Sequence, residues 1–171
     1  MATADSEVTV LYSTGENQVP EGLYAALLAA DSGLVTLKAP NANAVIDHLR
    51  LIARRQGQSI YCWSAEGGLA SLREDGISVP GSQRPLDAMR YVLHANHFGI
   101  YLFPGATPAF FTQVGPQLRQ LARSLGNPDR RVVLMAPEIR MAPGLASIAA
   151  HLEICQREIP KFRLRDGRWV V

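Results

Sequence analysis

The chain has 171 residues, of which 47% are hydrophobic and 19% charged, and its formal net charge at pH 7 is +2. This composition is typical of a single globular domain, here residues 1–171, and excludes disordered and coiled-coil chains. The small net charge argues against nucleic acid as a partner. No stretch reaches the roughly 18 apolar residues of a membrane span, so we expect no membrane insertion. With only two cysteines and no signal-peptide pattern, we expect reduced thiols and a cytoplasmic protein.

Apolar runs alternate along the chain with segments of helical periodicity. The sequence predicts strands at residues 8–13, 34–38, 60–63, 99–103, 132–135 and 152–155. It predicts helices at residues 21–30, 41–57, 85–95, 114–125 and 143–150. Asn41 can cap the second helix and Gly57 can end it. The fourth helix should stop at the Gly-Asn-Pro run of residues 126–128.

The fold class follows from the character of the strands. They are almost continuously apolar, which is typical of a mostly parallel sheet with helices on both faces. The closing segment FRLRDGRWVV alternates apolar and basic residues around Asp166-Gly167, a pair that favours a hairpin turn. We therefore expect an α/β domain whose C-terminal hairpin forms an antiparallel edge of the sheet.

Ligands of such sheets bind in loops beyond the carboxyl ends of the strands. These loops are expected at residues 38–41, 64–68, 104–107 and 136–140. The candidate ligand-binding residues in them are Lys38, Asn41, Ser64, Glu66 and Thr107. At Ser64 and Glu66 a nucleophile or oxyanion site is conceivable, but the GxSxG elbow is absent, so a ligand-contacting or purely structural loop is favoured. No metal site is expected, because His94 and His97 have no third ligand nearby.

Four groups of segments carry a resemblance to a known family. They are GLVTLK with AVIDHLRLIARRQG; IYCWSAEGGL; RPLDAMRYVLHANHFGIYLF; and VVLMAPEIRMAPGLASIAAHLEICQREIP. From about residue 23 to residue 160, their order resembles the N-terminal domain of AAA-type ATPases known as hypothetical chloroplast reading frames. The resemblance implies a degenerate P-loop NTPase-like fold placed before a true ATPase module.

The residues that hydrolyse a nucleoside triphosphate are missing from this sequence. A working P-loop, GxxxxGK[ST], wraps phosphate with backbone N–H groups and adds a lysine and a magnesium-binding hydroxyl. The nearest segment, residues 14–22, has two glutamates and no lysine. Pro104 stands where the family usually has an aspartate, and Lys38-Ala39-Pro40-Asn41 replaces its acidic, threonine-containing loop. We therefore expect neither a cofactor nor enzymatic activity.

Two groups of basic residues stand out, and the first allows opposing interpretations. Lys161, Arg163, Arg165 and Arg168 form the basic row of the C-terminal segment, which could bind a partner or merely protect a sheet edge. Arg130 and Arg131 are expected to be solvated charges where a strand begins.

The leading hypothesis is a non-catalytic interaction or regulatory domain that binds a protein, for example an ATPase or a secretion or assembly component. The alternative is a sensor that binds a nucleotide or another phosphorylated small molecule without hydrolysing it. In the sensor, Lys38 beside Asn41 would form the best phosphate site, because helix N-termini attract anions.

Overall fold

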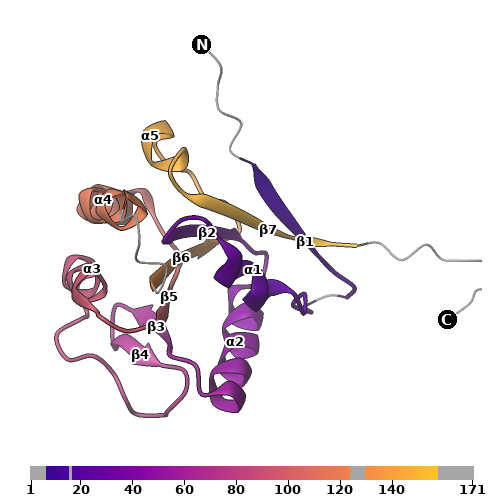
Figure 1. Ribbon diagram of the computed structural model, residues 1–171, viewed down its shortest axis with the longest axis horizontal. Coiled ribbons are helices and arrows are strands. Elements are labelled where there is room, and N and C mark those ends of the chain that lie inside the picture. Colours follow the sequence, from indigo (N-terminus) through magenta and orange to yellow (C-terminus); the bar gives the residue numbers. More distant parts are fainter. Residues whose placement is uncertain (1–6, 16, 124–129, 158–171) are drawn as a thin grey trace, which may run out of the picture.

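Strands and helices alternate along the chain (Figure 1), as the apolar runs predict. The structure is a computed structural model that describes residues 7–15, 17–123 and 130–157. The strands are β1 (Val8–Ser13), β2 (Leu34–Lys38), β3 (Ile60–Ser64), β4 (Gly68–Ser71), β5 (Gly99–Pro104), β6 (Arg130–Ala136) and β7 (Ala150–Gln156). The helices are α1 (Leu23–Ala29), α2 (Ala42–Gln56), α3 (Pro85–His94), α4 (Pro108–Arg123) and α5 (Pro143–Ala146).

The strands form one seven-stranded sheet in the order β1-β7-β2-β6-β5-β3-β4. Every neighbouring pair is parallel except β3 with β4, which confirms the mostly parallel α/β class. The sequence prediction missed β4 and treated its residues as loop. Within the described residues β4 is the antiparallel edge, while the hairpin expected after residue 160 lies outside them, as does the helix end expected at residues 126–128.

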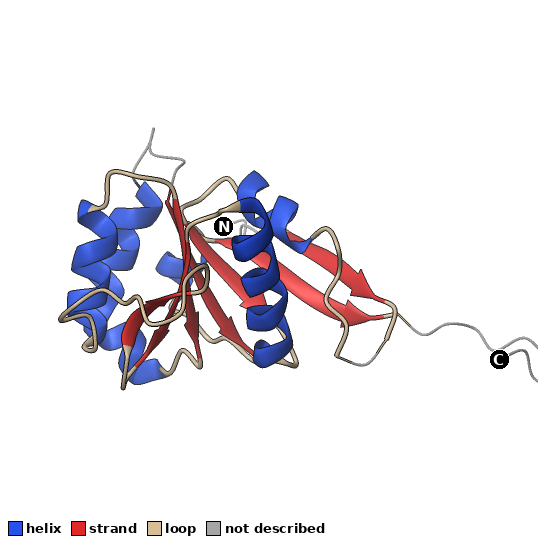
Figure 2. Ribbon diagram, turned by 90° about the horizontal axis from the view of Figure 1, so that it is seen from below, coloured by secondary structure: helices blue, strands red, loops and turns tan. Residues whose placement is uncertain are grey.

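Helices cover both faces of this sheet, as predicted (Figure 2). Successive residues of a strand point to opposite faces, so β2 sends Val35 and Leu37 to one side and Leu34 to the other. Val35 and Leu37 pack in the layer formed by α1 and α2, and Leu34 packs in the layer formed by α3, α4 and α5. All three side chains are fully buried. Of the described helices, none is long and apolar enough to cross a bilayer.

The order of the strands defines a switch point at the carboxyl edge. From β2 the chain crosses to β3 through α2, on one face, whereas from β6 it crosses to β7 through α5, on the other face. Since β2 and β6 are neighbours, their outgoing connections leave in opposite directions. Such a point is where open α/β sheets bind their ligands. A ligand site is therefore expected at the loop between β2 and α2.

Arg130 and Arg131 are not solvated, which corrects the sequence prediction: each is 6% exposed. They are consecutive residues of β6, so their side chains lie on opposite faces of the sheet. Arg130 donates hydrogen bonds to the carbonyl groups of Val92 and Leu93 at the end of α3. Arg131 reaches the end of α1 and donates to the carbonyl group of Leu27 over 3.3 Å. Each guanidinium thus satisfies helix C-terminal carbonyl groups and complements the negative end of a helix dipole.

Candidate functional site

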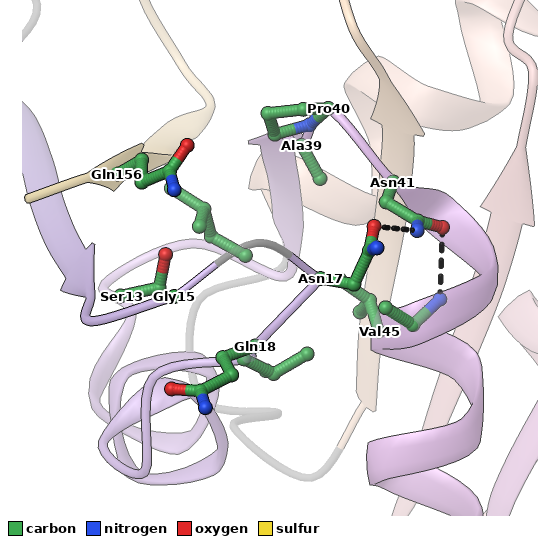
Figure 3. A pocket seen from close by; sticks show the side chains of 12 residues that line it. Ser13, Gly15, Asn17, Gln18, Ala39, Pro40, Asn41, Val45 and Gln156 are labelled. Carbon is green, nitrogen blue, oxygen red and sulfur yellow. Dashed lines mark hydrogen bonds between the residues drawn. The ribbon is translucent and has the colours of Figure 1, made fainter.

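A cavity of about 360 Å³ lies at the carboxyl ends of β1, β7 and β2 (Figure 3). The loop after β1, the loop after β2 and the first turn of α2 surround it. Its lining residues are Ser13, Gly15, Asn17, Gln18, Val19, Ala39, Pro40, Asn41, Ala44, Val45, Ile154 and Gln156. Because β7 lies between β1 and β2, the cavity spans the end of β7.

Asn41 joins two walls of this cavity. It is the N-cap of α2, and its side-chain oxygen accepts a hydrogen bond of 3.1 Å from the Ala44 N–H, as the sequence predicts. Its side-chain nitrogen donates to Asn17 Oδ1 at 2.6 Å (Figure 3). Asn17 has a φ of 59°, a left-handed conformation that asparagine tolerates better than most residues. The amide pair therefore ties the loop after β1 to the start of α2.

Lys38 is not part of the cavity wall, although it precedes Asn41 by only three residues. Its position in β2 turns the side chain toward the face that carries α3 to α5, away from α2. There its ammonium nitrogen lies 3.8 Å from a carboxylate oxygen of Glu138 and 3.7 Å from one of Glu153. The structure thus separates the proposed pair of Lys38 and Asn41 and offsets the lysine charge with two carboxylates.

The described residues that line the cavity include no charged side chain. Its polar groups are the hydroxyl of Ser13 and the amides of four residues, Asn17, Gln18, Asn41 and Gln156. Ala39, Val45 and Ile154, all at most 7% exposed, form its apolar base. Neutral amides can exchange hydrogen bonds with an uncharged polar group, but they cannot neutralise a triphosphate.

The other candidate residues lie elsewhere, and two of them, Ser64 and Thr107, have structural hydrogen bonds. Ser64 Oγ accepts a bond of 3.0 Å from the Gly67 N–H in the turn between β3 and β4. Glu66 is an exposed residue of the same turn. Thr107 Oγ1 accepts a bond of 3.3 Å from the Phe110 N–H at the start of α4. These contacts favour the structural interpretation of Ser64 and show that Thr107 caps a helix.

A second pocket, of about 260 Å³, lies beside Thr107 at the carboxyl ends of β3 and β5. Trp63, Phe103 and Phe110 form its aromatic wall, with ring centroids 5.8 Å apart for Trp63 and Phe103 and 5.5 Å for Phe103 and Phe110. The indole N–H of Trp63 donates to the Ser82 carbonyl at 2.9 Å. Sequence reasoning missed this pocket, although aromatic residues at two strand ends and the start of a helix were visible.

Neither an activated cysteine nor a cluster of metal ligands is found in the part of the chain that the structure describes. Burial raises the pKa of the Cys62 thiol, and the nearby Arg50 lowers it only in part. Partial burial and contact with Glu153 raise the pKa of the Cys155 thiol. Both thiols are therefore weak nucleophiles at neutral pH. No group of three His, Cys, Asp or Glu residues able to hold a metal ion occurs within residues 7–15, 17–123 and 130–157.

Comparison with known proteins identifies one family. A family model described as "SpoVK-like AAA ATPase, N-terminal domain" matches residues 24–154, well over half of the chain. No curated protein and no solved structure matches the sequence. The match begins within α1, so β1 lies outside the matched segment. It confirms the resemblance to an N-terminal domain of AAA-type ATPases. The chain belongs to the family of SpoVK-like AAA ATPase N-terminal domains.

Proposed function

We propose that this chain is a cytoplasmic, non-catalytic binding domain that acts through contact with a protein, an AAA-type ATPase module being the foremost candidate. Within the family it is a degenerate P-loop-like domain, of the type that precedes the ATPase module of hypothetical chloroplast reading frames. The proposal rests on the backbone groups and charges at the loop between β2 and α2.

Three backbone positions of that loop and the first turn of α2 cannot donate to a phosphate. Its Ala39 N–H already donates to the Ala136 carbonyl at 3.0 Å, and Pro40 has no N–H. The Asn41 side chain takes the Ala44 N–H of the first helical turn. A P-loop instead depends on several free N–H groups that converge on phosphate. The backbone of the β2 loop therefore argues against nucleotide hydrolysis at this position.

The charges needed for phosphoryl transfer are also missing from this edge of the sheet. Transfer depends on a cation at the phosphates and a carboxylate that holds magnesium. Lys38 points to the opposite face and pairs with two glutamates, and the last residue of β5 is Pro104. Among the described residues, the cation for the phosphates and the carboxylate for magnesium are thus both missing from their expected positions. Together these two absences argue against nucleotide hydrolysis.

A hydrolysis assay tests the catalytic half of the proposal. The purified chain with Mg²⁺ and ATP or GTP should release no phosphate above the blank. A turnover of about 1 s⁻¹, typical of the slow end of enzyme rates, would contradict the proposal if a single substitution such as Asn41→Ala abolished it.

A test of the proposed protein interaction needs a defined partner. Lys161, Arg163, Arg165 and Arg168 remain the predicted partner-binding residues and lie outside the described part of the chain. Binding to a purified AAA-type ATPase module can be measured by calorimetry. Arg163→Glu with Arg165→Glu should abolish it, whereas the control Arg54→Glu with Arg55→Glu, on the exposed end of α2, should not. Equal loss in both variants, or no binding by the unaltered chain, would contradict the proposal.

A sensor that binds a nucleotide or another phosphorylated small molecule is the second candidate; the cavity of about 360 Å³ could hold the uncharged base or sugar of such a ligand, because its described lining offers amide groups. A ligand that binds only the folded chain stabilises the folded state by roughly 2.7 kcal/mol when its free concentration is a hundred times its Kd. A panel of nucleotides should then raise the melting temperature. Ala44→Leu, which narrows the cavity, should remove that shift, and Ala25→Leu on the exposed side of α1 should leave it intact. The absence of any shift favours the protein-binding proposal.

A further inference from the structure

The aromatic pocket walled by Trp63, Phe103 and Phe110 has no part in the function proposed above. Phe103 is 1% exposed and Phe110 is 7% exposed, whereas Trp63 is only half-buried. Protein interiors are close-packed, with few voids larger than a water molecule. A space of about 260 Å³ against these rings is therefore more than an imperfection of the core, and it leaves apolar surface of the indole uncovered.

The aromatic pocket lies where parallel α/β sheets usually bind ligands, at the carboxyl ends of two neighbouring parallel strands, β3 and β5. The first residue of α3, Pro85, and the first turn of α4 complete its wall. Gly105, in the loop after β5, has a φ of 73°, and a Cβ added there would meet no heavy atom within 4 Å apart from its chain neighbours. The loop therefore passes the pocket without placing a side chain in it.

The lining indicates the chemical class of a ligand. No charged side chain is found among the described residues that line the pocket. Besides the indole N–H of Trp63, which donates to the Ser82 carbonyl, the described lining has two polar side chains, Thr107 and Gln113. The Thr107 hydroxyl accepts a hydrogen bond from the Phe110 N–H and can still donate one, and the Gln113 amide can both donate and accept. Such a lining favours a neutral ligand that carries a hydrogen-bond acceptor.

The arrangement and size of the pocket favour a planar ring system. The rings of Trp63 and Phe103 are within 21° of parallel, while Phe110 is inclined by 51° to the first and by 47° to the second. Walls in two orientations can meet the face and the edge of a planar ligand, the two contacts that aromatic rings prefer. An apolar cavity of about 150 Å³ binds benzene, so the larger pocket has room for two fused rings.

We propose that the aromatic pocket binds a neutral two-ring heteroaromatic group, such as a purine base, stacked on Trp63 and hydrogen-bonded by Thr107 or Gln113. The site does not depend on the protein contact proposed above. It is also separate from the cavity beside Asn41, because Phe103 packs in the layer of α3 to α5 and that cavity lies on the α1 and α2 side of the sheet. No phosphate is needed for binding, in contrast to the phosphorylated ligand of a sensor.

Fluorescence titration of the full chain carrying Trp169→Phe tests the inference, because Trp63 is then its only tryptophan. Adenosine should quench the Trp63 emission along a saturable curve, with a Kd of about 0.1–10 mM for a ligand of this size. AMP should bind no more tightly than adenosine, since the described lining has no cation for its phosphate.

Variants assign the quenching to this pocket. Ala109→Leu adds bulk at an exposed position in the first turn of α4 and should weaken adenosine binding about tenfold, as expected when stacking of a base is prevented. Gln113→Ala, also at an exposed position, should weaken it about threefold through the loss of one hydrogen bond. Ala25→Leu on α1 and Ala44→Leu in the other cavity are the matched controls and should leave the Kd within about twofold.

Three outcomes would overturn the inference. The first is quenching that stays linear up to about 10 mM adenosine, which would mean collisional contact without a site. The second is an equal effect of Ala109→Leu and the two controls or, where urea unfolding shows that Ala109→Leu does not fold, an unchanged Kd in Gln113→Ala. The third is AMP binding about tenfold tighter than adenosine, which would mean that a phosphate contact dominates.

Discussion

The buried guanidinium of Arg130 should be a major contributor to stability. Arg130→Met keeps much of the side-chain length but removes the donors that bind the Val92 and Leu93 carbonyl groups. These carbonyl groups belong to the last turn of α3; without Arg130 the Val92 carbonyl keeps only the Ala95 N–H at 3.3 Å, and the Leu93 carbonyl loses its guanidinium donor. The positive charge that faces the helix C-terminus would be lost as well.

The expected loss in the free energy of unfolding follows from these contacts. A hydrogen bond that involves a charged group contributes about 1.5–3 kcal/mol, and a partly buried helix-dipole interaction contributes up to about 2 kcal/mol. Removing the charge also removes the cost of its burial, so we expect a net loss of about 3 kcal/mol from the free energy of unfolding. For a domain of this size, that lowers the melting temperature by about 6–12 °C.

Urea unfolding and thermal melting measure this effect. The control is Arg55→Met, the same substitution at an exposed position in the last turn of α2. It should change the free energy of unfolding by no more than about 0.5 kcal/mol. If Arg130→Met destabilises the domain no more than Arg55→Met does, the reasoning about buried helix caps is wrong for this protein.

Three further substitutions test other parts of the structure. Asn41→Ala removes the cap of α2 and the contact with Asn17, and should cost about 1–2 kcal/mol in urea unfolding. Gly68→Ala should cost at least about 2 kcal/mol, because Gly68 has a φ of 68° and an added Cβ would lie 2.3 Å from Ser82 Oγ. Burial raises the pKa of the Tyr101 hydroxyl, so above pH about 10 the unfolded chain releases a proton that the folded chain retains, and stability falls. Tyr101→Phe should weaken that decline in urea titrations at rising pH, and an unchanged decline would contradict this assignment.

The local pattern of the sequence was sufficient to predict most of the sheet and the helices. Continuous apolar runs of β-branched and aromatic residues become buried strands, and one-sided periodicity becomes a covering helix, because both satisfy the backbone while burying apolar surface. β4 escaped prediction because GLAS is short and has no β-branched residue. It is a strand only because the edge of β3 is beside it and Gly68 adopts the left-handed conformation that closes the hairpin.

The candidate site depended on tertiary structure. Asn17 and Gln156 are far apart in the sequence and have no chemical signature, yet the position of β7 between β1 and β2 brings them to one cavity. Lys38 and Asn41 are close in sequence, but the alternation of β2 sends the lysine to the other face. Composition and the spacing of apolar residues determine which segments are buried. Which polar groups meet depends on strand order and on the face that each residue occupies, and both are set by contacts between distant segments.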